Sequence, residues 1–282
     1  MSDIKYFCIR GFMKSGTNWL GSLIDSHEAI SVVGEYHWQK IALPFKEMMK
    51  NHSLFQERDC KEFVREGFAE FVKRVLRHNA EPSALLIGDR TPARLEPTII
   101  KDAPCISIVR DGRDVLVSRA FHLFNNSKIH RLFERIPSMK LDLERFEADP
   151  WIFKKKPELL LRHKRMVIES VRMWREHLEA DRASVESNKE LSAKFVRYED
   201  LHADTEGVRK SLFEFLGVNP KRAAKLEGVL KPGFKEERPS EFLRKGAVGD
   251  WTNYFTDDTK AWFKEEGGEE LIRQGYETSL DW

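Results

Sequence analysis

Apolar residues along the chain follow two periodicities, and segments of the two kinds alternate. Short runs rich in β-branched and aromatic residues are typical of buried strands. Such runs occur at about 4–9, 29–33, 84–89, 104–109 and 193–198. Between them, apolar residues recur every three or four positions, which is typical of amphipathic helices. These helices are predicted at about 19–24, 56–79, 112–121 and 166–178, with two more within about 204–228.

The alternation predicts an α/β fold with a central, mainly parallel sheet of about five strands, covered by helices on both faces. No internal repeat or low-complexity linker divides the chain, so we expect one domain over residues 1–282 with a helical insertion at about 122–165. The first two strands are expected to run side by side. Because ligands of such sheets bind beyond the carboxyl ends of the strands, candidate chemistry is expected there.

A glycine-containing loop joins the first predicted strand to the first predicted helix. Gly11 and Gly16 have the G-x-x-x-x-G spacing of a Walker A loop, but Thr17 and Asn18 follow where that motif requires Lys and Ser/Thr, and Lys14 lies inside the loop. Backbone N–H groups and the positive end of the helix dipole favour an anion at such a turn. The loop therefore predicts a phosphate site of unusual residue order, the alternative being an ordinary strand-to-helix turn.

Two further segments carry cations at predicted strand or loop ends. Arg110 ends the fourth strand, and Ser118 follows eight residues later on a helix; an arginine fork and a hydroxyl suit a phosphate. The alternative is an ion pair of Arg110 with Asp111 or Asp114. Near the C-terminus, residues 244–251 read R-K-G-A-V-G-D-W, and adjacent cations before a glycine can clamp an anion. The alternative there is a solvated basic turn.

Together the three segments resemble the sulfotransferases that use 3′-phosphoadenosine 5′-phosphosulfate (PAPS). Residues 14–19 resemble the family's K-S-G-T-x-W loop, residues 110–118 its 3′-phosphate element, and residues 244–251 its R-K-G-x-x-G-D-W signature. The resemblance implies a P-loop-like nucleotide-hydrolase fold. It also implies in-line transfer of a sulfuryl group from PAPS to a hydroxyl or amine of a small-molecule acceptor, which leaves adenosine 3′,5′-bisphosphate.

The resemblance also implies which residues hold the donor. Lys14 would stabilise the charge that develops on the bridging oxygen, and Trp19 and Phe234 would lie on the two sides of the adenine. Tyr198, in a Y-E-D element, would meet the donor near the 3′-phosphate. The implied binding residues are Lys14, Ser15, Gly16, Thr17, Asn18, Trp19, Arg110, Ser118, Tyr198, Phe234, Arg244, Lys245 and Gly246. Sulfonate carries less charge than a terminal phosphoryl group, so no metal is expected.

The acceptor must lose a proton, which requires a base near the strand ends. The histidine of the cytosolic family's K-T-H motif is missing, because the corresponding residues 88–92 read G-D-R-T-P. Residues 34–38, G-E-Y-H-W, instead resemble the E-x-H-F element of heparan-type sulfotransferases, in which the glutamate is the base. Glu35 is therefore the first candidate, and Asp89 and His37 are the alternatives.

Glu35 also has a structural interpretation, in which it forms an ion pair with Arg90 or Arg94. If the second strand runs beside the first, the carboxylate of Glu35 reaches the space in front of Lys14. The acceptor itself is not specified by these motifs, and its pocket is expected from the loops and insertions at about 36–55 and 122–165. The family's dimer motif is not matched after residue 251, so the oligomeric state stays open.

Composition limits the possible partners and the possible cellular location of the protein. Of 282 residues, 41% are hydrophobic and 33% charged, and the net charge of +2 gives no reason to expect a nucleic-acid partner. Neither a signal peptide nor a membrane span is predicted. The three cysteines, Cys8, Cys60 and Cys105, are odd in number, which favours reduced thiols and a cytoplasmic location.

Two other classes of protein are compatible with parts of this pattern. A P-loop-type small-molecule or nucleotide kinase would need a lysine after Gly16 and a carboxylate for Mg²⁺, for which Asp89 could serve. A nucleotide-binding protein without enzymatic activity is the third class, and the presence of Lys14 argues against it.

Overall fold

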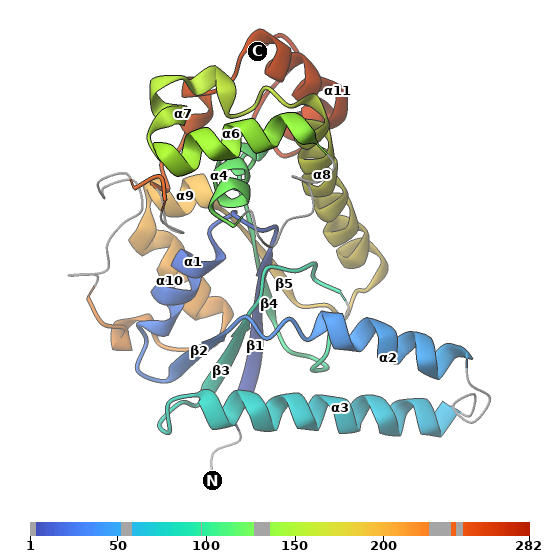
Figure 1. Ribbon diagram of the computed structural model, residues 1–282. Coiled ribbons are helices and arrows are strands. Elements are labelled where there is room, and N and C mark those ends of the chain that lie inside the picture. Colours follow the sequence, from blue (N-terminus) through green and yellow to red (C-terminus); the bar gives the residue numbers. More distant parts are fainter. Residues whose placement is uncertain (1–3, 52–57, 97, 127–135, 226–237, 241–244) are drawn as a thin grey trace. The chain divides into compact units, whose positions relative to one another are not determined.

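The computed structural model describes residues 4–51, 58–96, 98–126, 136–225, 238–240 and 245–282 (Figure 1). Phe234 and Arg244, both expected to bind the donor, lie outside these ranges. The chain forms two compact units, the first comprising 1–109 with 180–229 and the second 110–179 with 230–282. Each is described separately below.

The first unit holds a five-stranded sheet in which every pair of neighbouring strands is parallel. Its strands are β1 (Lys5–Gly11), β2 (Ile30–Gly34), β3 (Leu86–Arg90), β4 (Cys105–Val109) and β5 (Ala193–Arg197), in the spatial order β2-β3-β1-β4-β5. The predicted α/β fold with about five parallel strands is thus confirmed. The expectation that β2 runs beside β1 is wrong, because β3 lies between them. A crossover connection can skip a place in the sheet, and chain order does not reveal this.

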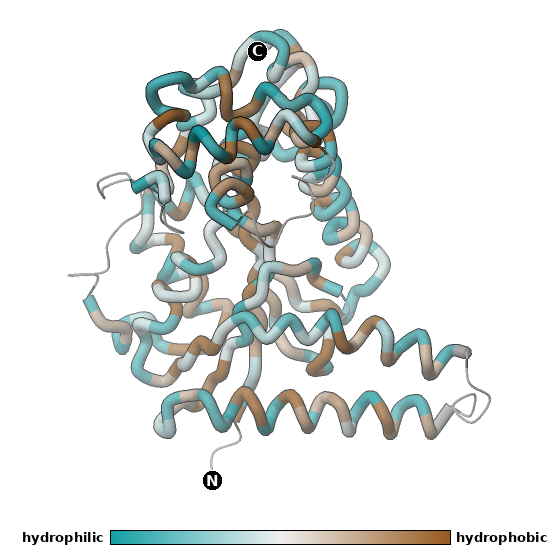
Figure 2. Tube along the Cα trace, viewed as in Figure 1, coloured by the Kyte–Doolittle hydropathy of each residue, from teal (hydrophilic) through white to brown (hydrophobic). Residues whose placement is uncertain are grey.

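Helices cover both faces of this sheet. On one face, α1 (Thr17–Asp25) and α10 (Thr205–Phe215) pack in one apolar cluster with Phe7 and Ile9 of β1. On the other face, Val72 and Leu76 of α3 (Arg58–Asn79) pack against Ile87 of β3. Apolar and polar residues alternate along α3, as expected of a helix with one buried side (Figure 2).

The first unit also holds residues 180–187, the end of a helix that begins in the second unit, and three further elements. These three are α2 (Gln39–Asn51), α9 (Tyr198–Ala203) and the 3₁₀ turn η4 (Pro220–Arg222). The helical periodicity of α2 is interrupted by Pro44, and the sequence did not predict this helix. Two helices were predicted within about 204–228; in the part of that segment up to residue 225, residues 205–215 are α-helical and residues 220–222 form the 3₁₀ turn.

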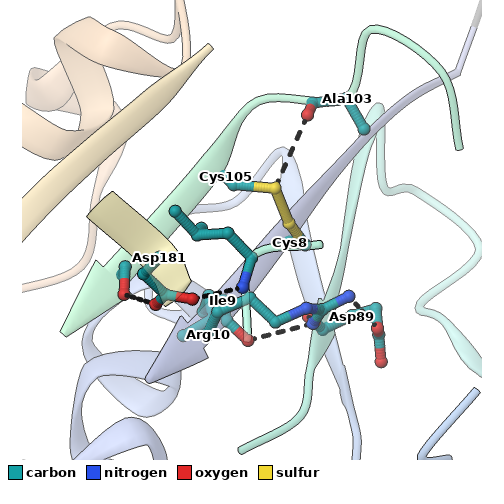
Figure 3. Close-up of a disulfide and its surroundings, with 9 residues drawn as sticks. Cys8, Ile9, Arg10, Asp89, Ala103, Cys105 and Asp181 are labelled. Carbon is teal, nitrogen blue, oxygen red and sulfur yellow. Dashed lines mark hydrogen bonds and ion pairs between the residues drawn. A yellow bond between two sulfur atoms is a disulfide. The ribbon is translucent and has the colours of Figure 1, made fainter. Parts of the chain in front are cut away.

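A disulfide joins two neighbouring strands of the sheet. Cys8 of β1 and Cys105 of β4 are opposite each other in the strand register and are bonded through their sulfur atoms (Figure 3). Cys60 is free. The expectation of reduced thiols is therefore wrong for this pair, because strands that are 97 residues apart in the sequence become neighbours only in the folded sheet.

The second unit is helical. Its elements are α4 (Gly112–Asn125), α6 (Pro137–Ala148), α7 (Ile152–Lys155), η3 (Pro157–Leu159), α8 (Lys164–Ser187) up to residue 179, η5 (Asp250–Asn253) and α11 (Asp257–Arg273). Aromatic rings of Phe121, Phe124, Phe146 and Phe153 pack together in its interior. The sequence did not predict α11, whose glycine pair Gly267-Gly268 weakens a helical pattern. Of the helices that the structure describes, none is both long enough and apolar enough to cross a bilayer.

Candidate active site

The loop between β1 and α1 is turned by two left-handed residues. Lys14 has a φ of 69° and Gly16 a φ of 103°. Ser15 between them is buried, and its backbone N–H donates to the carbonyl of Phe12 over 3.1 Å. Gly16 is the N-cap residue of α1; it offers no side-chain cap, and the first turn of the helix carries no acidic residue. No side-chain cap and no first-turn acidic side chain therefore offsets the positive end of α1, and such a helix end favours an anion.

The aromatic ring of Tyr198, directly after β5, packs against this loop. Tyr198 begins α9 and is 2% exposed. A methyl group added at Gly16 would lie 2.6 Å from Cδ2 of the Tyr198 ring, so only glycine fits there. The Tyr198 ring meets that of Trp19 edge to face, with centroids 5.5 Å apart, and Trp19 is itself largely buried in the apolar cluster. Thr17 is buried too, whereas Lys14, Gly16 and Asn18 are half-buried, so the predicted binding segment lies at the edge of the packed core.

Asp89, a candidate base, is engaged in a buried ion pair. Its Oδ2 lies 2.7 Å from the guanidinium of Arg10, and both side chains are only 6% exposed (Figure 3). Arg10 also donates to the backbone carbonyl of Asp89 over 2.9 Å, and the Thr91 hydroxyl donates to Oδ1 over 3.0 Å. The pair lies on the sheet face that also carries Cys8, since Cys8 and Arg10 are two residues apart on one strand.

Arg90, the next residue, points to the opposite face because side chains alternate along a strand. Two glycines make room for it. An added methyl at Gly21 of α1 would lie 2.6 Å from Arg90 Cδ, and one at Gly34 of β2 would lie 2.4 Å from Nη2. Nη1 of Arg90 is 3.3 Å from Oε1 of Glu35. The arginine thus lies between α1 and the end of β2, and of the two arginines considered from the sequence it is the one that pairs with Glu35.

Glu35 and His37 form a short, partly exposed segment after β2. Their side chains are 36% and 38% exposed, and His37 Nε2 lies 4.0 Å from Glu35 Oε2. Both residues have positive φ angles, 30° and 53°. Among the non-glycine residues that the structure describes, such angles occur at Lys14, Glu35, His37 and Asp102. Strained backbone of this kind clusters at functional sites, and three of these four residues are candidate catalytic residues.

In the second unit, the structure brings together two of the motifs. Arg110, 6% exposed, donates from Nη2 to the carbonyl of Ala247 over 2.7 Å, and Nη2 lies 3.6 Å from Oδ2 of Asp114. Lys245 places Nζ 2.9 Å from Oδ1 of Asp250. Ser118 lies on α4, partly buried. Arg110 thus contacts the R-K-G segment, by which we mean the described residues 245–251, and the ion pair left open by the sequence is formed with Asp114.

Sequence reasoning missed two contacts around this segment. Arg113 lies over the ring of Trp251, 4.1 Å from its centroid, and 4.6 Å from that of the C-terminal Trp282. Burial lowers the pKa of Arg113, but its hydrogen bonds and ion pairs with Asp111 and Glu277 outweigh this and raise it. The signal in the sequence is weak, because cation–π contacts between residues so far apart leave no local pattern.

The fold and the loop together define a nucleotide-binding α/β enzyme of the P-loop kind. Comparison with known proteins narrows the class, since residues 5–273 match the family model described as a sulfotransferase domain. The chain therefore belongs to the sulfotransferase family and is a PAPS-dependent sulfotransferase. Nothing in the comparisons favours the kinase alternative.

Individual relatives agree with this assignment. Sulfotransferase 2A1 of Mus musculus is 27% identical over 265 residues, covering 87% of this chain and 76% of the relative. Cytosolic sulfotransferase 3 of Arabidopsis thaliana is 27% identical over 210 residues, covering 64% of this chain and 58% of the relative. Among solved structures, mouse sulfotransferase SULT7A1 complexed with PAP has a TM-score of 0.52 at 18% identity, covering 98% of this chain and 88% of that one. At this identity the structural likeness shows the fold alone.

Proposed function

We propose that this sulfotransferase binds the phosphosulfate end of PAPS at residues 14–19 and the 3′-phosphate through Arg110, Ser118 and Lys245. The observation that carries the proposal is the geometry of the loop. Left-handed backbone at Lys14 and Gly16 leads directly into the uncapped N-terminus of α1, which is an anion-binding arrangement. The 18% identical neighbour complexed with PAP is consistent with it.

PAPS supplies a sulfuryl group that is already activated by its phosphate leaving group. The chain then has to stabilise the charge that develops on that leaving group, and the ammonium of Lys14 within the loop is suited to this. The N–H groups of the first turn of α1 add partial positive charge at the same place. A metal is not required by this arrangement, and its absence from the reaction stays a prediction.

We propose Glu35 as the base that takes the acceptor's proton. Its carboxylate is partly exposed, whereas that of Asp89 is buried and held by Arg10. Because β3 separates β2 from β1, the end of β2 lies two strand spacings, about 10 Å, from that of β1. That separation leaves room for an acceptor hydroxyl or amine between Glu35 and Lys14. His37, 4.0 Å from Glu35, is the second candidate.

The acceptor is proposed to be a small molecule, and the location to be the cytoplasm. The name of the Arabidopsis relative supports that location. Disulfides are rare in a reducing cytoplasm. Intact mass of the purified protein with and without alkylation will therefore report whether Cys8 and Cys105 are bonded in the cell that makes it.

A ligand panel tests the proposal. A ligand at a hundredfold excess over its dissociation constant stabilises a protein by about 2.7 kcal/mol, which a thermal-shift assay detects. We expect stabilisation by adenosine 3′,5′-bisphosphate and little by ATP with Mg²⁺. Arg110→Ala should weaken the bisphosphate far more than adenosine 5′-phosphate, whereas Arg165→Ala, at an exposed pair on α8, should change neither. Stabilisation by ATP with Mg²⁺ alone would contradict the proposal.

The acceptor is then found by transfer. The protein is incubated with PAPS and a library of phenols, alcohols and amines, and each product is read by mass spectrometry as an added sulfuryl group. Transfer to no member of a broad library, by a protein that binds the bisphosphate, would contradict the small-molecule acceptor.

A further inference from the structure

Asp114 is a buried carboxylate whose two oxygens are both engaged by the backbone of the R-K-G segment. It lies in the first turn of α4 and is 2% exposed. Oδ2 accepts the N–H of Gly249 over 2.8 Å, and Oδ1 accepts the N–H of Trp251 over 3.0 Å. A single side chain thus binds the turn at two points that are two residues apart.

Arg110 contacts the same turn through a backbone carbonyl, whereas Asp114 contacts it through backbone N–H groups. It donates to the carbonyl of Ala247 and lies 3.6 Å from Oδ2 of Asp114. Burial and the nearby charge of Asp111 raise the pKa of Asp114, and the charge of Arg110 and the two backbone N–H groups offset only part of this rise. A buried charge is costly unless it is paired and hydrogen-bonded, and these three partners meet that requirement.

Because Asp114 holds the backbone at Gly249 and Trp251, it also fixes the position of Asp250, which lies between them. Gly249 has a left-handed φ of 77° and is the N-cap of the 3₁₀ turn η5, whose first residue is Asp250. Asp250 Oδ1 lies 2.9 Å from Lys245 Nζ and accepts the side-chain N–H of Asn253 over 3.0 Å. A chain of contacts therefore runs from Asp114 through the backbone of the turn to Asp250, and from Asp250 to Lys245.

We infer that Asp114 is a positioning residue for the donor's 3′-phosphate: it sets the turn at residues 247–251 and thereby orients Arg110 and Lys245. This inference rests on the proposed donor site. Asp114 itself does not touch the phosphate, because a carboxylate repels an anion and both of its oxygens are occupied. Its role is to keep two cations, on separate segments of the chain, at fixed positions.

Asp114→Asn tests this role. The amide keeps the shape, but one oxygen is lost as an acceptor and the charge opposite Arg110 is removed. We expect the dissociation constant of adenosine 3′,5′-bisphosphate to rise about tenfold or more, as loss of a charge-assisted hydrogen bond does. The dissociation constant of adenosine 5′-phosphate should stay within about twofold, and the KM for PAPS should rise more than kcat falls. Asp257→Asn, at a fully exposed aspartate of the same unit, is the matched control.

A double-mutant cycle with Lys245→Ala separates positioning from a general loss of structure. If Asp114 acts through Lys245, Asp114→Asn costs less bisphosphate affinity in the Lys245→Ala background than in the wild type. Should Asp114→Asn fail to fold, Asp250→Asn interrupts the next link and must show the same selective loss. An equal loss for both nucleotides, full additivity in the cycle, or an unselective Asp250→Asn overturns the inference.

The affinities of the wild-type protein for the two nucleotides distinguish a failure of this inference from a failure of the proposed donor site. A wild-type protein that binds the bisphosphate and the 5′-phosphate equally overturns the proposed donor site, and the role of Asp114 with it. A wild-type preference for the bisphosphate that persists in Asp114→Asn overturns the role of Asp114 alone.

Discussion

Replacing Gly16 by alanine is expected to disturb the donor loop in two separate ways. The residue has a φ of 103°, which is unfavourable for any side chain, and its missing Cβ faces the Tyr198 ring at 2.6 and 2.8 Å. The ring belongs to a residue that is 2% exposed and packs against Trp19. The ring cannot move aside without disturbing the core, so the loop has to move instead.

The size of the effect follows from three terms. Left-handed backbone costs a non-glycine residue about 1–2 kcal/mol, and overpacking a well-filled core costs about 1–3 kcal/mol. The lower entropy of alanine in the unfolded chain offsets about 0.4–1 kcal/mol of this. We therefore expect Gly16→Ala to lower the free energy of unfolding by about 1–5 kcal/mol and to weaken bisphosphate binding.

Urea denaturation of the variant and a matched control measures this. Gly67 lies within α3, and an added methyl there meets nothing within 4 Å, so Gly67→Ala should stabilise by about 0.5–1 kcal/mol. In a Tyr198→Leu background, Gly16→Ala should lose the steric part of its cost and keep the backbone part. A Gly16→Ala protein with wild-type stability and wild-type bisphosphate affinity would refute the close approach of Tyr198 to the loop.

Three further predictions concern chemistry and pH. Lys14→Ala should lower turnover by about 10²-fold or more, and near-wild-type turnover would remove Lys14 from the mechanism. Glu35→Gln should abolish most transfer while leaving bisphosphate affinity within a small factor, whereas Asp89→Asn should mainly lower stability because it leaves the buried charge of Arg10 unpaired; the reverse result would make Asp89 the base. Burial lowers the pKa of His163 below its usual 6.5, so the folded state binds a proton there less tightly than the unfolded chain does. Unfolding free energy should therefore fall more in the wild type than in His163→Gln between about pH 7.5 and about pH 5.5, and equal falls would contradict this.

Local patterns predicted the elements that carry the site because each depends on neighbours in the chain. The apolar run before Gly11 and the helical spacing after Gly16 predicted a strand, a loop and a helix, and the structure has all three. The prediction that the Glu35 carboxylate reaches the space in front of Lys14 assumed that β2 is the neighbour of β1. In the sheet β3 lies between them, and no local sequence pattern reveals this order.

The sequence by itself determined the parallel α/β fold, the donor motifs and the family. Periodicity and motif spacing depend on residues that are close together in the chain, so they can be recognised without knowing the fold. The tertiary structure alone decided the long-range contacts. It put Cys8 opposite Cys105, it made Arg10 the partner of Asp89, and it placed the turn at 247–251 on the carboxylate of Asp114. Such pairings depend on which strands and turns meet after folding, and that is settled by burial and by the pairing of buried charges over the whole chain.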